Sequence, residues 1–130
     1  MRPLAPGVWT SPQPSPGDMA AVAAAGVRRV INNRPDGEEP GQPTSAEMEA
    51  AARAAGMDYL WIPVRGMPDP EQAAAVGEAL DDGVPTLLFC RSGTRSTVAW
   101  AIARRARGDD PEALRGAAAG AGYDLSRLPL

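Results

Sequence analysis

Residues 86–97 of this 130-residue chain bring together the residue types needed for nucleophilic chemistry. The apolar run Thr86–Cys90 predicts a buried strand that ends on the cysteine. A short turn containing Gly93, which permits a positive φ angle, leads to Arg95 and a helix-forming segment. Backbone N–H groups of such a turn can surround an anion, and the helix N-terminus adds partial positive charge. This field favours thiolate over thiol, so we expect Cys90 to act as a nucleophile without a histidine.

The residues of this loop have separate expected roles. Cys90 is the predicted nucleophile, and Arg95 is expected to close over a bound oxyanion. The other predicted substrate-binding residues of the loop are Arg91, Ser92, Gly93, Thr94 and Ser96. Arg91 can point outward and recruit an anion, while a hydroxyl of Ser96 or Thr97 can donate to the thiolate or the leaving group. The alternative is that Cys90 is a small buried hydrophobic residue, which this sequence context makes the weaker interpretation.

Composition limits the chemistry further. The chain has 13 basic and 16 acidic residues, a net charge of −3, one cysteine and no histidine. All the basic residues are arginines. This inventory excludes disulfides within the chain, Cys/His zinc sites, Ser-His-Asp triads and lysine-based catalysis, and we expect no metal or cofactor. The negative charge argues against nucleic acid and anionic membranes as partners. No apolar run predicts a membrane span, so a soluble cytoplasmic protein with a reduced thiol is expected.

Strand-like runs alternate with helical segments along the chain. The predicted strands are residues 7–10, 27–32, 59–64 and 86–90. The predicted helices are residues 19–25, 45–55, 70–80 and 96–106, with a fifth that begins at 110–112 and ends at 120–122. This order predicts a single α/β domain over residues 1–130, with a four- to five-stranded, mostly parallel sheet flanked by helices. Trp9, Trp61 and Trp100 are expected to pack in the core and between layers.

Arginine and asparagine follow the strands at the edge where ligands of parallel sheets bind. Arg34 is predicted either to bind an anionic substrate or to pair with Glu38 or Glu39, with neither favoured. Asn33, with Asn32, is expected near the substrate, where it can hydrogen-bond the active loop from the neighbouring strand. Turn chemistry is the simpler alternative for both asparagines.

Two aspartates are candidates for a general acid. Asp69 lies after the third strand and can protonate a leaving group, but it also precedes Pro70, where an N-cap belongs. The cap is the favoured interpretation. Asp36 is the weaker candidate, since Pro35-Asp36-Gly37 has the composition of a turn.

Two resemblances to known families are carried by these residues. The segment Cys90–Ser96 resembles the active-site loop of rhodaneses, which carry sulfur as a cysteine persulfide. Nearly the whole chain resembles the phosphatase-like domain of beta-lactamase hydrolase-like proteins, in residues 30–38, 55–59, 62–64 and 122–125. That resemblance implies a three-layer fold related to dual-specificity phosphatases and a sulfur-transfer activity. It also implies a persulfide dioxygenase partner, since the family is often fused to such a domain.

Loop length separates the activities that these resemblances imply. Cysteine-dependent phosphatases place five residues between cysteine and arginine, whereas four residues separate Cys90 from Arg95. A tighter ring suits a sulfur atom better than a phosphoryl group, and sulfur transfer from thiosulfate expels sulfite without a general acid. The main hypothesis is therefore a sulfurtransferase that moves sulfur from thiosulfate or a persulfide, through Cys90, to a thiol or cyanide. The alternatives are a tyrosine- or dual-specificity-type phosphatase and a non-catalytic module that binds an oxyanion or a partner.

Overall fold

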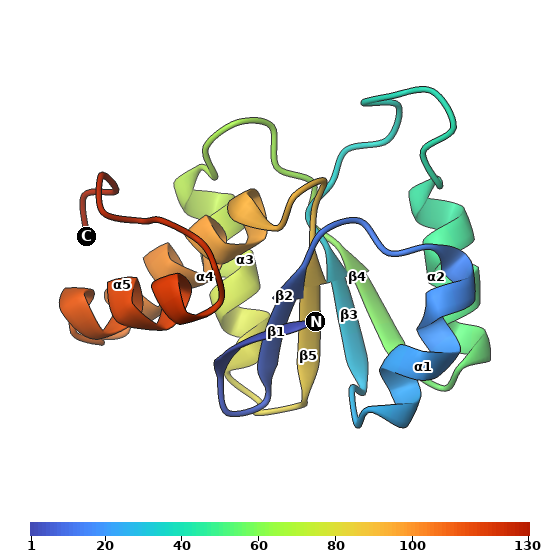
Figure 1. Ribbon diagram of the computed structural model, residues 1–130, viewed down its shortest axis with the longest axis horizontal. Helices are drawn as coiled ribbons and strands as arrows, with labels where there is room; N and C mark the ends of the chain where they lie inside the picture. The colour runs from blue at the N-terminus through green and yellow to red at the C-terminus, as the bar shows by residue number, and fades with distance from the viewer.

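A five-stranded sheet in the order β1-β2-β5-β3-β4 forms the middle layer of the computed structural model, which describes residues 1–130 (Figure 1). The strands are β1 (Arg2–Ala5), β2 (Val8–Ser11), β3 (Arg29–Asn32), β4 (Asp58–Trp61) and β5 (Thr86–Phe89). β1 pairs with β2 in antiparallel fashion, and all the other pairs are parallel. The predicted mostly parallel sheet is confirmed, and β1 is the strand that no sequence pattern indicated.

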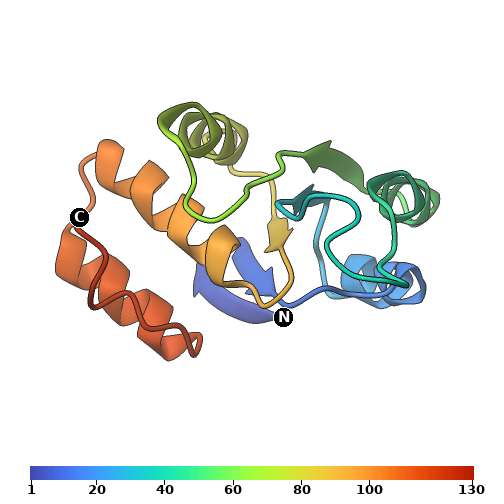
Figure 2. The same ribbon diagram turned by 90° about the horizontal axis from the view of Figure 1, so that it is seen from above.

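Helices cover both faces of the sheet. They are α1 (Met19–Ala24), α2 (Ser45–Ala54), α3 (Pro70–Leu80), α4 (Thr94–Ala106) and α5 (Pro111–Gly120), with a short 3-10 turn, η1 (Pro16–Asp18), before α1. α1 and α2 lie on one face, α3 and α4 lie on the other, and α5 packs beside α4 and β1 (Figures 1 and 2). The predicted α/β fold with three layers is therefore confirmed.

Alternating side chains of the central strand bind the layers together. Leu87 and Phe89 belong to a core cluster with residues of α1 and α2, whereas Leu88 belongs to a cluster with residues of α3 and α4. All three side chains are fully buried. Because successive side chains of a strand point to opposite faces, one short apolar run anchors β5 on both sides. The strand that leads to Cys90 is thus held firmly in place.

The ends of several elements differ from the predicted ones. α4 begins at Thr94, two residues before the predicted start, so Arg95 lies inside the first helical turn. The Asp69 side chain accepts a hydrogen bond from the backbone at the start of α3, as its N-cap pattern predicted, and Thr44 does the same at the start of α2. Trp100 is buried as expected, but the prediction for Trp61 is wrong, because this residue is 45% exposed.

The parallel strands end in register at one edge of the sheet. Ser11 and Asn32 both pair with Phe89, and Asn32 also pairs with Trp61. The loops after β2, β3, β4 and β5 therefore open at the same edge, and Cys90 follows the central strand there. None of the helices combines the length and apolar character that crossing a membrane requires.

Candidate functional site

The thiol of Cys90 lies at the centre of a backbone turn between β5 and α4. Cys90 is a fully buried free cysteine, and the Gly93 N–H donates to its Sγ across 3.1 Å. Gly93 has a φ of +95°, in the left-handed region that favours glycine. The predicted turn is therefore confirmed, and a backbone donor already points at the sulfur.

The Gly93 carbonyl is fixed from outside the turn. Its oxygen accepts hydrogen bonds from Thr97 Oγ1 at 2.8 Å and from Thr10 Oγ1 at 3.3 Å. The expectation that the Thr97 hydroxyl serves the thiolate or the leaving group is therefore wrong, because that hydroxyl is used to hold the backbone.

Two further carbonyls of the turn are held by residues remote in the sequence. The Ser92 oxygen accepts from Tyr123 Oη at 2.9 Å, and the Arg91 oxygen accepts from the Gln13 N–H at 3.1 Å. In a trans peptide the N–H points opposite to the C=O, so outward carbonyls turn the next N–H groups inward. This arrangement is what an anion cradle requires.

Arg95 leaves the first turn of α4 and reaches across to the loop after β3. Its Nη1 donates to Glu38 Oε2 at 2.7 Å and to the Val64 carbonyl at 2.8 Å, and its Nη2 donates to Glu38 Oε1 at 2.8 Å. The hydrogen bond with Glu38 raises the pKa of Arg95, burial opposes that effect, and the neighbouring Cys90 adds to the rise. Arg95 thus carries a positive charge beside the cysteine.

Glu38 is the acidic partner that the site arginines share. The hydrogen bond from Arg95 lowers the pKa of Glu38 from 4.5 to about 2, against the opposing effect of burial and with further help from Arg34. The carboxylate is therefore ionised at neutral pH. The sequence predicts Glu38 only as a partner for Arg34, and no local pattern indicates that it also binds Arg95.

Arg34 is a buried support of the site. Its side chain is only 1% exposed, and it donates to Glu38 Oε1 at 2.9 Å, Glu39 Oε1 at 2.7 Å and Gln13 Oε1 at 3.2 Å. Of the two predicted roles the structure has the ion pair, so the assignment of Arg34 to substrate binding is corrected. Arg91 does point outward as predicted, with 68% of its side chain exposed and Glu39 at 3.5 Å.

Asn33 and Ser96 are buried and bind each other. Ser96 Oγ donates to Asn33 Oδ1 at 2.8 Å, and Asn33 Nδ2 donates to the Ile62 carbonyl at 2.9 Å. Both residues are fully buried. Their assignment to substrate binding is therefore corrected, whereas the predicted hydrogen bond from Asn33 to the active-loop segment is confirmed.

Ser92 and Thr94 lie at the outer rim of the turn. Ser92 Oγ donates to Thr94 Oγ1 at 3.1 Å and accepts from the Thr94 N–H at 3.3 Å. Both residues are exposed, so their hydroxyls stand where an incoming substrate can contact them.

The two candidate acids each bind the backbone at the start of a helix. Asp69 Oδ1 accepts from the Gln72 N–H at 2.8 Å, and the Asp69 N–H donates to Gln72 Oε1 at 2.9 Å. Asp36 Oδ1 accepts from the Ser45 N–H at 2.8 Å. The favoured N-cap interpretation of Asp69 is confirmed, and its catalytic role stays a prediction.

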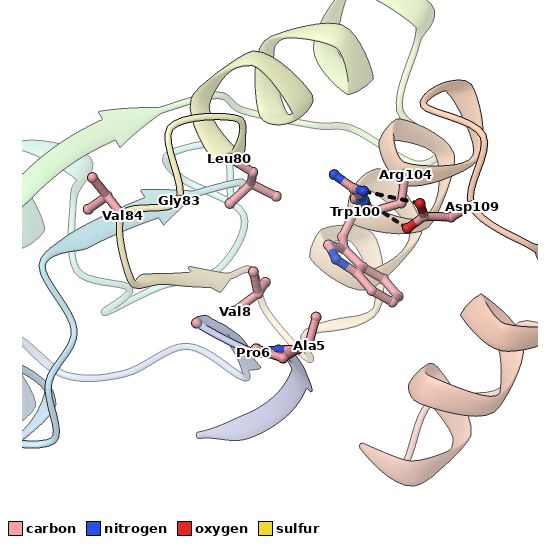
Figure 3. A pocket seen from close by; sticks show the side chains of 10 residues that line it. Ala5, Pro6, Val8, Leu80, Gly83, Val84, Trp100, Arg104 and Asp109 are labelled. Carbon is pink, nitrogen blue, oxygen red and sulfur yellow. Dashed lines mark hydrogen bonds and ion pairs between the residues drawn. The ribbon is translucent and has the colours of Figure 1, made fainter.

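A cavity of about 260 Å³ lies at the opposite edge of the sheet (Figure 3). Its walls include Val8 and Val84, which lie at or just before the amino ends of β2 and β5, and the side chain of Trp100. Since Cys90 follows the carboxyl end of β5, this cavity does not take part in the candidate site.

Comparisons with known proteins agree with this geometry. Residues 1–107 match the family described as "Beta-lactamase hydrolase-like protein, phosphatase-like domain". A beta-lactamase hydrolase-like protein of Xylella fastidiosa (strain Temecula1) is 40% identical over 124 residues, which cover 90% of this chain and 28% of that protein. The chain thus spans less than a third of that curated relative.

Solved structures show the same fold. A candidate phosphatase (nma1982) from Neisseria meningitidis Z2491 superposes with a TM-score of 0.84 and 28% identity, covering 97% of this chain and 91% of that one. The kinase associated phosphatase KAP, with its catalytic-site cysteine replaced by serine, superposes with a TM-score of 0.72. At 16% identity, over 90% of this chain and 76% of that one, KAP supports the fold alone. The fold is therefore that of the cysteine phosphatases.

Proposed function

This chain belongs to the family of phosphatase-like domains of beta-lactamase hydrolase-like proteins, and from that premise we propose that it hydrolyses phosphomonoesters through a phosphorylated Cys90. The observation that carries the proposal is the position of Cys90 Sγ, which accepts the Gly93 N–H at 3.1 Å beside the charged Arg95. A tetrahedral oxyanion bound there meets backbone donors on one side and a guanidinium on the other.

The reaction proceeds in two displacements. The Cys90 thiolate attacks phosphorus, an S–P bond forms, and the ester P–O bond breaks with its electron pair on the leaving oxygen. Water then attacks the same phosphorus, the S–P bond breaks, and inorganic phosphate and the thiolate are released. Arg95 and the inward N–H groups stabilise the negative charge that builds up on the phosphoryl oxygens in both steps.

Asp69 is the proposed proton donor for the leaving oxygen. Its Oδ1 is held by the Gln72 N–H, whereas Oδ2 has no hydrogen bond in the structure. Asp69 is an exposed residue of the β4–α3 loop, at the edge of the sheet where Cys90 lies. The same carboxyl can therefore cap α3 through one oxygen and exchange a proton through the other.

Sulfur transfer is the second candidate, and the spacing of Cys90 and Arg95 favours it. Four residues separate Cys90 from Arg95. Sulfite leaves without a general acid, so this reaction does not require Asp69, whose carboxylate caps α3. Here the Cys90 thiolate attacks the outer sulfur of thiosulfate, the S–S bond breaks, and sulfite leaves with the electron pair. A thiol or cyanide then takes the outer sulfur from the Cys90 persulfide. A persulfide dioxygenase partner stays a prediction tied to this candidate.

One experiment distinguishes these activities. The purified chain and its Cys90→Ser variant are incubated separately with an aryl phosphate and with thiosulfate, quenched in acid and measured by intact-mass spectrometry. We expect a phosphoryl adduct on the wild type with the aryl phosphate, absent from Cys90→Ser, together with steady release of phosphate. An added sulfur atom with thiosulfate, and no phosphoryl adduct, would replace phosphatase by sulfurtransferase. If neither reagent forms an adduct, both activities are overturned, and the remaining hypothesis is a non-catalytic module that binds an oxyanion or a partner.

A further inference from the structure

Two neighbouring carboxylates on the loop after β3 hold the arginines around Cys90. Glu38 binds Arg95 through both oxygens, and Glu39 binds Arg34 at 2.7 Å and lies 3.5 Å from Arg91. Resting on the proposed function, we infer that Glu38 is a positioning residue: it orients the Arg95 guanidinium so that its free N–H groups face the oxyanion bound at Cys90.

The hydrogen-bond pattern of Arg95 supports this role. A guanidinium has five N–H groups, and three of them are used by the Glu38 carboxylate and the Val64 carbonyl. The two that remain are Nε–H and one N–H of Nη2, which lie side by side on one edge of the planar group. Such an edge binds two oxygens of one anion. Glu38 therefore occupies the end of the guanidinium and leaves a complete bidentate edge for the substrate.

Glu38 is itself held from its other side. Its Oε1 accepts from Nε of Arg34 at 2.9 Å, and the Arg34 side chain is almost completely buried. The Arg34 backbone is fixed as well, because its carbonyl accepts from Trp61 Nε1 at 2.9 Å and its N–H donates to Asn32 Oδ1 at 2.7 Å. The carboxylate is thus anchored to the sheet edge and can act as a fixed point for Arg95.

The opposing hypothesis is that Glu38 competes with the substrate for Arg95. A carboxylate on Arg95 also reduces the positive potential that attracts an anion, so Glu38 can instead act as a competitor of the substrate. The two roles predict opposite changes when Glu38 loses its charge. A positioning residue supports kcat, whereas a competitor weakens binding and its removal raises activity.

The test compares Glu38→Gln with two other glutamates changed in the same way. Glu39→Gln removes a negative charge from the neighbouring residue, which pairs with Arg34 and not with Arg95. Glu49→Gln removes a negative charge from an exposed ion pair with Arg53 on α2. We expect Glu38→Gln to lower kcat for an aryl phosphate by about 10- to 100-fold, because misplaced catalytic groups cost factors of that size, while KM does not rise. Glu39→Gln should keep most of kcat, and Glu49→Gln should match the wild type. Equal losses in Glu38→Gln and Glu39→Gln, or a gain in Glu38→Gln, would overturn the inference.

A second measurement does not depend on turnover. The rate of Cys90 alkylation is measured with iodoacetate, which is anionic, and with iodoacetamide, which is neutral, using Cys90→Ser as the blank. An oriented Arg95 favours the anionic reagent, so the ratio of the two rates should fall several-fold in Glu38→Gln and stay near the wild-type value in Glu49→Gln. If the wild type lacks phosphatase activity but the ratio falls as expected, the proposed function fails and the positioning role stands. An unchanged ratio in Glu38→Gln removes the positioning role whatever the activity.

Discussion

The hydroxyl of Ser96 donates a hydrogen bond of 2.8 Å to Oδ1 of Asn33, and this bond ties the first turn of α4 to the end of β3. The backbone of Asn33 adds to the connection, since its N–H donates to the Phe89 carbonyl and its own carbonyl accepts from Val64. Asn33 therefore connects the loops after β3, β4 and β5. The orientation of the anion cradle depends on this buried residue.

Replacement of Ser96 by alanine tests that connection. Ser96→Ala leaves the buried Asn33 oxygen without its donor, which should lower the free energy of unfolding by about 1–3 kcal/mol and slow the Cys90-dependent reaction. Ser45→Ala is the matched control, because Ser45 is a buried serine of α2 that bonds Tyr59 Oη at 2.7 Å. Urea unfolding should show a loss in both variants. Kinetics should show a loss only in Ser96→Ala, and an equal loss of rate in Ser45→Ala would contradict the specific role of Asn33.

Gly93→Ala should abolish Cys90-dependent activity. An added Cβ would lie 2.0 Å from Tyr123 Oη, and the φ of +95° is unfavourable for alanine by about 1–2 kcal/mol. Gly108→Ala is the matched control, since Gly108 has a φ of +94° with nothing within 4 Å of the added carbon. In both variants the free energy of unfolding should fall by the cost of placing alanine at a positive φ. The additional loss in Gly93→Ala then measures the clash, and equal stabilities would show that Tyr123 moves aside freely.

How far the sequence predicted the site depends on how local each interaction is. Cys90, Gly93 and Arg95 could be predicted because strand, turn and helix follow one another within one short segment. Tyr123 and Gln13 could not, because they reach the turn from segments distant in the chain and nothing near them indicates a role. Glu38 could be predicted as a partner of Arg34, which it is, but its bond to Arg95 could not be predicted, because that bond depends on how the loop after β3 folds back.

The same distinction holds for the fold. The capped helices and buried parallel strands follow local rules of capping and apolar patterning, and they were predicted to within a few residues. β1 was not, because a short edge strand whose first two residues are exposed carries no apolar alternation. The sequence predicts core and layer packing for Trp61, because nothing in it indicates another role for this side chain. Its indole instead donates to the Arg34 carbonyl at the rim, which no pattern in the sequence indicates.

Tyr123→Phe should weaken the turn without dismantling it. The variant loses the 2.9 Å hydrogen bond to the Ser92 carbonyl, which is worth about 0.5–1.5 kcal/mol, and the freed peptide can rotate its N–H away from the cradle. We expect a modest loss of stability and a several-fold loss of kcat/KM. Tyr59→Phe is the control, since Tyr59 Oη bonds Ser45 and Asn32 and makes no hydrogen bond with the turn. A rate loss no greater than in Tyr59→Phe would mean that the turn keeps its shape alone.

Asp69→Asn separates the two roles of Asp69. Asparagine caps a helix about as well as aspartate, so this variant should keep the stability of the wild type, whereas Asp69→Ala should lose about 0.5–2 kcal/mol. If Asp69 protonates the leaving oxygen, Asp69→Asn should slow hydrolysis of an alkyl phosphate by about 100-fold or more. Hydrolysis of p-nitrophenyl phosphate should slow much less, because nitrophenolate leaves without a proton. If Asp69→Asn hydrolyses each of the two substrates as fast as the wild type does, Asp69 serves only as a helix cap.

The ion pair of Glu38 with Arg95 predicts how stability changes with pH. Because the pKa of Glu38 falls from 4.5 to about 2 on folding, the ionised form stabilises the folded state. That contribution is complete above the unfolded pKa and is lost as the pH falls through the folded one. The free energy of unfolding of the wild type should therefore exceed that of Glu38→Gln by a constant amount above about pH 5, and the difference should shrink steadily towards about pH 2. Urea titrations across this range measure it. Glu49→Gln, whose ion pair is exposed on both sides, should show little difference at any pH, and a difference for Glu38→Gln that persists unchanged at the acid end would contradict the ion pair as its source.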